Sequence, residues 1–410
     1  MVIKQLAGER LVGTAAERAA LSTVTAPAQT SWKVVARGRV TGGTSSNVDG
    51  VDTGTGNSSS NNNVITVNTL YSNPPDNLMF LMHFEKPDTN SRDLSLNLGK
   101  DTIEFDHVFQ RKRNISNTSG WSSVEDTNRF TLANAHNELL EHSFNLGFIS
   151  NIASQPKNIT GFRGATANDG WANGLNSAEI GTAVMMGGSW KGGDGSGSQW
   201  TNKLNRLTFH RKQIGGSSHY YLGEDSEFVI LGCDNNESDN ETRGDTFWNL
   251  IGETELDSAG ELTATFAAKR WLMFEIYGAS DSSDSKGFIF NDTTSSQYGH
   301  RTLKGREGYS DGSYKRTGQA CIYANGISNN TDNVWWNGYI DNASNGASKL
   351  ICCELMVVDG SNTGSTEPNH TYTDGKWSNS AQVTSITATD HEGNKIDYKS
   401  GSWIRVWGSD

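Results

Sequence analysis

The chain has 410 residues, 45 of them glycine and only six proline, with a formal net charge of −12. This length predicts two or three domains, and each half is long enough to bury its own core. The acidic balance argues against nucleic-acid binding, which needs a basic face, and no apolar run is long enough to span a membrane. Abundant turn-forming residues with β-branched and aromatic residues predict an all-β protein.

Residues 1–29 are predicted to form an N-terminal arm. Thr14 and Glu17 have the spacing of a capping box, which would start a helix of about two turns ending at Leu21. A helix this short is not stable alone, so we expect the arm to fold on a partner surface, with a disordered tail as the alternative. The first residues lack the apolar segment of a secretory signal, so we expect synthesis in the cytoplasm without a signal peptide.

An internal repeat dominates the rest of the sequence. Seven short segments recur in the same order in the two halves, which indicates a duplicated domain. The matched segments are Thr30–Val35 with Thr246–Ile251, Val64–Val67 with Leu262–Thr265, Leu78–Met82 with Leu272–Ile276, Leu94–Asn97 with Phe288–Asn291, Gly147–Ser154 with Gly338–Ser344, Trp200–Asn202 with Trp377–Asn379, and Ser226–Gly232 with Ser402–Gly408. We therefore predict a first sandwich over 30–233, a linker over 234–245 and a second sandwich over 246–410.

Each copy is predicted to hold six to eight short strands in an antiparallel, jelly-roll-like β-sandwich. Residues 78–84 and 271–277 are the most continuously apolar and should be central strands. The first copy is longer, and its excess falls in two Gly-rich stretches, 41–63 and 161–198. We interpret both stretches as surface loops.

The linker 234–245 is polar and charged. Its side-chain oxygens have the rough spacing of a calcium-binding loop, but Asp239 stands where such a loop needs glycine. A solvated linker is therefore preferred over a calcium site.

No catalytic constellation is found in the sequence. His136 and His142 flank two glutamates, but their spacing of six suits neither one helix face nor a zinc motif. The four cysteines lack metal-ligand spacing, and Cys352 and Cys353 should fill core positions on opposite faces of one strand. We expect no metal, no cofactor and no enzymatic activity.

The tryptophans are the most informative candidate contact residues. Trp32, Trp248, Trp200 and Trp377 occupy matched repeat positions and are predicted to pack in the cores. Three others, Trp121, Trp171 and Trp190, are predicted to lie in Gly- and Ser-rich loops of the first copy. There they would stack on a glycan, pack between subunits or domains, or plug their own loops.

The ordered motifs resemble β-sandwich domains in structural proteins of tailed phages, particularly marine ones. The resemblance rests on Thr30–Lys33, Ile65–Val67, Leu78–Phe80, Gly147–Asn151, Trp200–Asn202, Ser226–Gly232 and the arm segment Lys4–Thr14. It implies a virion component, such as a tail appendage, a tail fibre for host attachment or a capsid decoration, made in the host cytoplasm.

The resemblance also implies partners: other virion proteins bound through the arm, further copies of the chain, trimers among them, and a host-surface glycan. Two alternatives stay open, a stand-alone carbohydrate-binding protein of lectin type and a polysaccharide-cleaving enzyme.

Overall fold

The fold is that of a computed structural model, which describes residues 32–39, 51–53, 65–68, 74–85, 93–100, 103–104, 108–115, 120–127, 130–133, 140–153, 155, 157–168, 180–190, 203–212, 219–220, 225–233, 247–280, 285–305, 312–323, 333–344, 346–358 and 369–410. Every helix or strand assigned over these ranges is a β-strand. The predicted all-β class is confirmed. The predicted arm helix, with Thr14, Glu17 and Leu21, and the linker 234–245 lie outside the described residues.

The first copy contains β1 (Lys33–Arg39), β2 (Val51–Thr53), β3 (Ile65–Asn68), β4 (Asn77–Glu85), β5 (Asp93–Lys100), β6 (Ile103–Glu104), β7 (Val108–Ile115), β8 (Gly120–Thr127), β9 (Phe130–Ala133), β10 (Leu140–Ser150), β11 (Lys157–Asn168), β12 (Ile180–Trp190), β13 (Arg206–Lys212), β14 (His219–Tyr220) and β15 (Glu227–Cys233). The second contains β16 (Asn249–Glu255), β17 (Thr263–Thr265), β18 (Trp271–Gly278), β19 (Lys286–Phe290), β20 (Tyr298–Gly305), β21 (Gly312–Gln319), β22 (Ile322–Tyr323), β23 (Asn333–Asp341), β24 (Lys349–Val358), β25 (Asn369–Trp377), β26 (Ser385–Asp390) and β27 (Trp403–Ser409).

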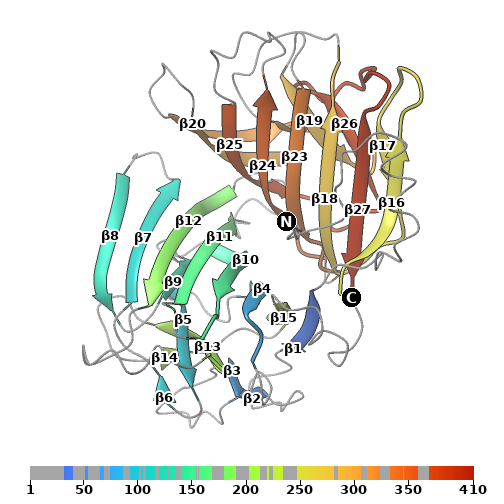
Figure 1. Ribbon diagram of the computed structural model, residues 1–410. Helices are drawn as coiled ribbons and strands as arrows, with labels where there is room; N and C mark the ends of the chain where they lie inside the picture. Colours follow the sequence, from blue (N-terminus) through green and yellow to red (C-terminus); the bar gives the residue numbers. More distant parts are fainter. Residues whose placement is uncertain are drawn as a thin grey trace.

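The two copies share one topology. An eight-stranded antiparallel sheet runs β1-β15-β4-β10-β11-β12-β7-β8 in the first copy and β16-β27-β18-β23-β24-β25-β20-β21 in the second. A second sheet accompanies each, built around β3-β13-β5 in one case and β17-β26-β19 in the other. Figure 1 shows the two units with β1–β15 in blue to green and β16–β27 in yellow to red. The chain is therefore two tandem antiparallel sandwiches of jelly-roll type, as predicted.

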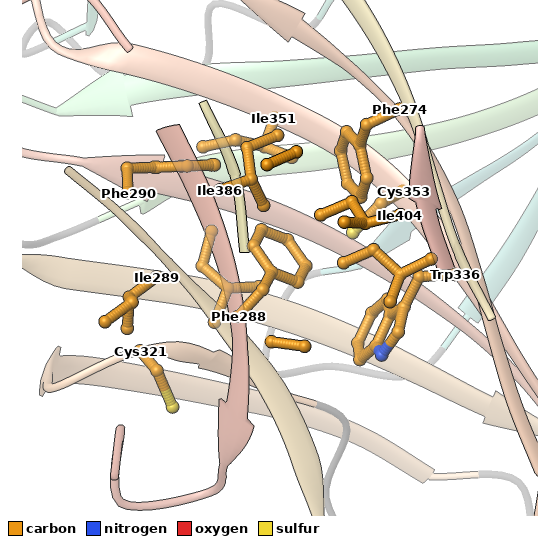
Figure 2. Close-up of a cluster of buried hydrophobic side chains, with 14 of the residues drawn as sticks. Phe274, Phe288, Ile289, Phe290, Cys321, Trp336, Ile351, Cys353, Ile386 and Ile404 are labelled. Atoms are coloured by element: carbon orange, nitrogen blue, oxygen red, sulfur yellow. The ribbon is translucent and has the colours of Figure 1, made fainter. Parts of the chain in front are cut away.

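The second copy has a core of its own between its two sheets. Figure 2 shows how Phe274, Phe288 and Trp336 converge there with the labelled isoleucines. Phe274 meets Phe288 edge to face at 5.1 Å between ring centroids, and Phe288 meets Trp336 at 5.3 Å. Burying a large apolar side chain of this kind stabilises the fold by about 1.5–3 kcal/mol.

The central strands β4 and β18 bury both of their faces. In β18, Leu272 and Phe274 join the core of the second copy, while Met273 points the other way into a separate apolar cluster. Successive strand residues alternate between faces, so a continuous apolar run requires a buried surface on each side. The prediction of central strands at 78–84 and 271–277 is confirmed.

The cysteines lie where the strand pattern predicted. All four are free and buried. Cys353 belongs to the core of the second copy, whereas its neighbour Cys352 belongs to the other apolar cluster. They act as small apolar fillers on opposite faces of β24.

Three sequence predictions about the repeat are wrong. The strands β1–β15 and β16–β27 each outnumber the six to eight predicted for one copy. The two stretches interpreted as loops contain strands: β2 lies within 41–63, and β11 and β12 occupy much of 161–198. Glycine-rich composition had suggested loops, but these backbones pair antiparallel with their neighbours.

The third error concerns tryptophan. Trp377 pairs with Lys349 at the end of β25, and in the first copy Trp190 pairs with Lys157 at the end of β12. Trp190, and not Trp200, is therefore the counterpart of Trp377. Trp200 itself lies outside the described residues.

Candidate functional site

The two eight-stranded sheets face each other, and we call the surface between them the seam. Three strands contact their own counterparts, β11 with β24, β12 with β25 and β7 with β20, and offset contacts join β11 to β25 and β12 to β20. An apolar cluster fills the seam, and its buried members are Trp32, Met79, Leu81, Phe144, Leu146, Val229, Leu231, Cys233, Phe247, Trp248, Trp271, Met273, Leu350 and Cys352. Both copies contribute, so the seam joins them through a buried apolar surface.

Matched aromatic pairs flank this cluster. Trp32 packs on Phe148 with ring centroids 6.0 Å apart and planes at 57°. Trp248 packs on Tyr339, also at 6.0 Å, with planes at 52°. A backbone hydrogen bond of 3.1 Å from the Phe247 N–H to the Trp32 carbonyl oxygen ties the starts of the two copies together. Equivalent aromatic pairs from the two copies thus lie in the seam.

A buried charged network crosses one corner of the seam, and its first member is His83 on β4. The His83 side chain is only 1% exposed; its Nδ1 contacts Asp341 of the second copy, and its Nε2 lies 2.7 Å from Glu85 Oε1. Burial lowers the pKa of His83, but Asp341, helped by Glu85, outweighs that effect and raises the pKa to about 9. At neutral pH the imidazole is therefore a cation that donates from both nitrogens.

Arg270 and Asp341 complete the network from the second copy. Arg270 donates from Nη1 to Asp341 and from Nε to Glu227 of the first copy. Burial opposes the charged form of Asp341, yet Arg270 and His83 hold the pKa of its carboxyl well below the ordinary value. Burial likewise opposes the Arg270 charge, but Asp341 and Glu227 raise the pKa of its guanidinium. Two cations and three carboxylates thus alternate in the order Glu85, His83, Asp341, Arg270 and Glu227.

Two further contacts border the network. The His142 ring lies 5.6 Å from that of His83, and its Nε2 is 3.1 Å from the Ser348 carbonyl oxygen of the second copy. Burial lowers the pKa of His142 to about 4, so this ring is neutral at pH 7. At the chain end, Arg37 donates to the Asp410 carbonyl oxygen at 3.4 Å.

This site can hold the two copies together. Each charged group of the network has an opposite charge as its partner; the His83 and Asp341 side chains are each 1% exposed, while those of Arg270 and Glu227 are 13% and 23% exposed. Within the part of the chain that the structure describes, no group of three or more His, Cys, Asp or Glu is placed to hold a metal ion. Among the same residues, no helix is long and apolar enough to cross a membrane.

The tryptophans predicted to make contacts are placed only in part. Trp121 lies in β8 and Trp190 ends β12, so the prediction that both lie in loops is wrong. Each backbone is paired, Trp121 with Arg113 and Trp190 with Val108 and Lys157. Trp171 lies outside the described residues. The contact roles of all three stay predictions.

The residues of the network were not predicted from the sequence. The sequence offers His142 only as a possible metal ligand and indicates no role for His83, Arg270 or Asp341. One signal was present: His83 is the single ionisable residue in the apolar run Leu78–Phe84. Such a residue inside a doubly buried strand needs a charged or hydrogen-bonding partner, but nothing in the sequence names that partner.

The fold and the seam define a class: a protein of two tandem jelly-roll-like β-sandwiches docked face to face. No protein-family model matches the sequence, and no curated protein matches it. Solved structures with some likeness include the LG1-3 region of the laminin alpha2 chain, at 11% identity and a TM-score of 0.21, covering 83% of this chain and 63% of that one. The mouse laminin alpha1 domains LG4-5 have 10% identity and a TM-score of 0.18, covering 84% and 85%. This chain therefore spans less than two thirds of the length of the laminin alpha2 LG1-3 structure.

Proposed function

We propose that this chain is a non-enzymatic structural protein of a tailed-phage virion, a tail appendage, fibre or capsid decoration. The observation that supports this most is the seam, which turns two sandwiches into one body. Each copy uses the face of its large sheet to pack on the other copy. A rigid block built this way suits a particle component that must hold its shape.

The resemblance of the ordered motifs to phage structural proteins supports the same proposal. In this proposal residues 1–29 tether the block to other virion proteins, and the particle sets the number of copies. Host-surface glycans are the proposed ligands of a projecting sandwich.

The test compares particles assembled with the full chain and with a chain lacking residues 1–29. Quantitative mass spectrometry of purified particles should find the full chain and little of the truncated one. Circular dichroism and thermal unfolding of the truncated chain should match those of the full chain. Normal incorporation of the truncated chain would contradict the tether, and absence of the full chain from purified particles would contradict the virion role.

A carbohydrate-binding protein unconnected with a virion is the second candidate. Its support is Trp121, because β8 is the last strand in the order of its sheet, and an edge strand is open to a ligand. A glycan array probed with the parent protein and with Trp121→Ala and Trp171→Ala separates the candidates. Trp190→Ala tests the third predicted contact residue in the same array. No binding by the parent protein would remove this candidate.

The third candidate, a polysaccharide-cleaving enzyme, is tested on a panel of bacterial polysaccharides. Release of reducing ends by the purified chain would support it. Inactivity on the whole panel would count against it.

A further inference from the structure

Part of the apolar cluster in the seam comes from equivalent positions of the two copies. Trp32 corresponds to Trp248 and Met79 to Met273, and all four lie in the same apolar cluster. Strands also contact their own counterparts, as β11 does β24. An interface made from the same patch on both partners is the arrangement of a twofold dimer. Other positions differ, because Leu81 of the first copy corresponds to Glu275 of the second. The shared apolar positions would still accept a like sandwich from another chain.

The charged residues break this equivalence. His83 pairs with Glu227 across β4 and β15, and at the same place in the second copy Tyr277 pairs with Trp403. The second copy thus has a stacked aromatic pair, 6.0 Å between centroids, where the first has a cation and a carboxylate.

The other half of the network is unmatched as well. Asp341 pairs with Trp271 in the second copy, and the register puts Ser150 in its place in the first. Arg270 precedes β18 directly, and Asp76 precedes β4 directly. Asp76 pairs with Lys203 of its own copy at 2.8 Å.

The wrong pairings are therefore penalised. In a seam between two first copies, Glu227 would meet Asp76 instead of Arg270, and His83 would meet Ser150. In a seam between two second copies, Asp341 and Arg270 would keep each other but lose their other partners, His83 and Glu227. Removing a partner from a buried ion pair is strongly destabilising, because a charge is left uncompensated.

The network is also a poor source of net stability. Desolvation offsets most of the attraction in a buried ion pair. In addition, Nη2 of Arg270 is buried with no hydrogen-bond partner among the residues that the structure describes. Selecting a partner is a role that such a network fills well, as polar residues do in coiled coils.

We propose that His83, Glu227, Arg270 and Asp341 determine pairing specificity: they direct the first sandwich onto the second and prevent like sandwiches of neighbouring chains from pairing. This matters most where many copies meet at high local concentration. The partner that the network recognises is the unlike copy, within the same chain or in another.

Charge exchange in the full-length protein tests the proposal. His83→Asp and Asp341→His each place like charges across the seam, whereas the double variant restores opposite charges. Hydrogen-exchange mass spectrometry reports seam closure at β18 and β24. Each single variant should exchange faster there by at least about tenfold, the change that a loss of about 1.4 kcal/mol produces. The double variant should return close to the wild-type rates.

Mixing the two single variants is the decisive arm. The unfolded variants, one of them labelled with ¹⁵N, are refolded together and alone. In the mixture, the first sandwich of the His83→Asp chain can pair with the second sandwich of the Asp341→His chain, which restores opposite charges at that seam. The two remaining sandwiches carry the native residues and meet at the second seam. Native mass spectrometry should then find mixed dimers, and seam protection should exceed that of either variant refolded alone.

Amides of Phe288–Phe290 in the core of the second copy serve as the internal control, and they should stay protected throughout. Wild-type protection of the seam in both single variants would overturn the proposal. So would a double variant that remains open, or a mixture no better protected than its components.

Discussion

Asn151 and Asn342 make the same three hydrogen bonds at the same place in the two sandwiches. Asn342 donates to the Lys269 and Val383 carbonyl oxygens and accepts from the Val383 N–H at 2.7 Å. Asn151 does the same with Pro75 and with both backbone groups of Leu204. In each copy this asparagine directly follows a strand of the large sheet, β10 or β23, and holds the loop that leads into β13 or β26 of the smaller sheet. This shared role explains why the Gly-aromatic-Ile-x-Asn motif recurs.

Asn342→Ala should lower the free energy of unfolding by about 3 kcal/mol, because it leaves several buried backbone groups unpaired. Asn151→Ala should have a similar effect. Urea denaturation followed by fluorescence measures both. Asn249→Ala at an exposed position is the control, with an expected change within about 0.5 kcal/mol. Equal stability of Asn342→Ala and the control would contradict the role of the motif.

Gly338→Ala should destabilise the second sandwich by about 1–3 kcal/mol through overpacking. A Cβ at this position would come within 2.6 Å of the Phe274 ring and 2.7 Å of Cys353 Cβ. Gly260 is the matched control, because a Cβ there would meet nothing within 4 Å. Calorimetric unfolding of the two variants should separate them. Equal melting temperatures of the two variants would show that the core accommodates the added methyl group without loss of stability.

The thiols of the native protein should not react with Ellman's reagent at pH 8. All four cysteines are buried, and burial raises the pKa of the Cys321 thiol to about 12. Unreactive thiols follow, because the thiolate is the reacting form and must be accessible. In guanidinium chloride all four should react. Rapid labelling of any cysteine in the native protein would contradict the burial of that residue.

The His83 network should make stability depend on pH in a defined direction. The pKa of His83 is about 9 when folded, against 6.5 for the free side chain. The folded state therefore binds more protons between these values. The stabilisation is fully present below pH 6.5 and is lost as pH rises through 9. The difference in unfolding free energy between wild type and His83→Gln should be about 3 kcal/mol near pH 6 and should shrink by pH 10.

His142→Gln is the matched control for this pH dependence. The pKa of His142 is lowered to about 4, so its contribution changes between pH 4 and 6.5 and is constant from 7 to 9. Urea denaturation of the three proteins at several pH values gives both curves. A His83→Gln difference that is flat from pH 7 to 10 would contradict the ion pair with Asp341.

The two-sandwich fold could be predicted because its strands follow local sequence patterns that recur in both copies. The runs Leu78–Phe84 and Leu272–Tyr277 are apolar on both faces, and their matched order identified the duplication. Cys352 and Cys353 were assigned to opposite faces by strand periodicity alone. Trp336 is buried in the core while its neighbour Trp335 is less buried, because successive strand residues face opposite ways.

The seam was not predictable in the same way. A strand that is apolar on both faces requires a covering surface on each side. The sequence does not tell whether the second surface comes from another chain or from the other copy. His83 and Asp341 are 258 residues apart, and no local pattern links them. Glycines surround Trp190 in the sequence, so a loop was predicted there. Its pairing with Lys157 places it at the end of β12 instead.

The docking of the two sandwiches is tested most directly by a double-mutant cycle on His83 and Asp341. Unfolding free energies at pH 7 are measured for wild type, His83→Gln, Asp341→Asn and the double variant. The same cycle on the exposed pair Arg39 and Asp225, 2.5 Å apart, should give less than about 1 kcal/mol. For His83 and Asp341 we expect a coupling energy of about 2 kcal/mol. A coupling near zero would contradict the seam.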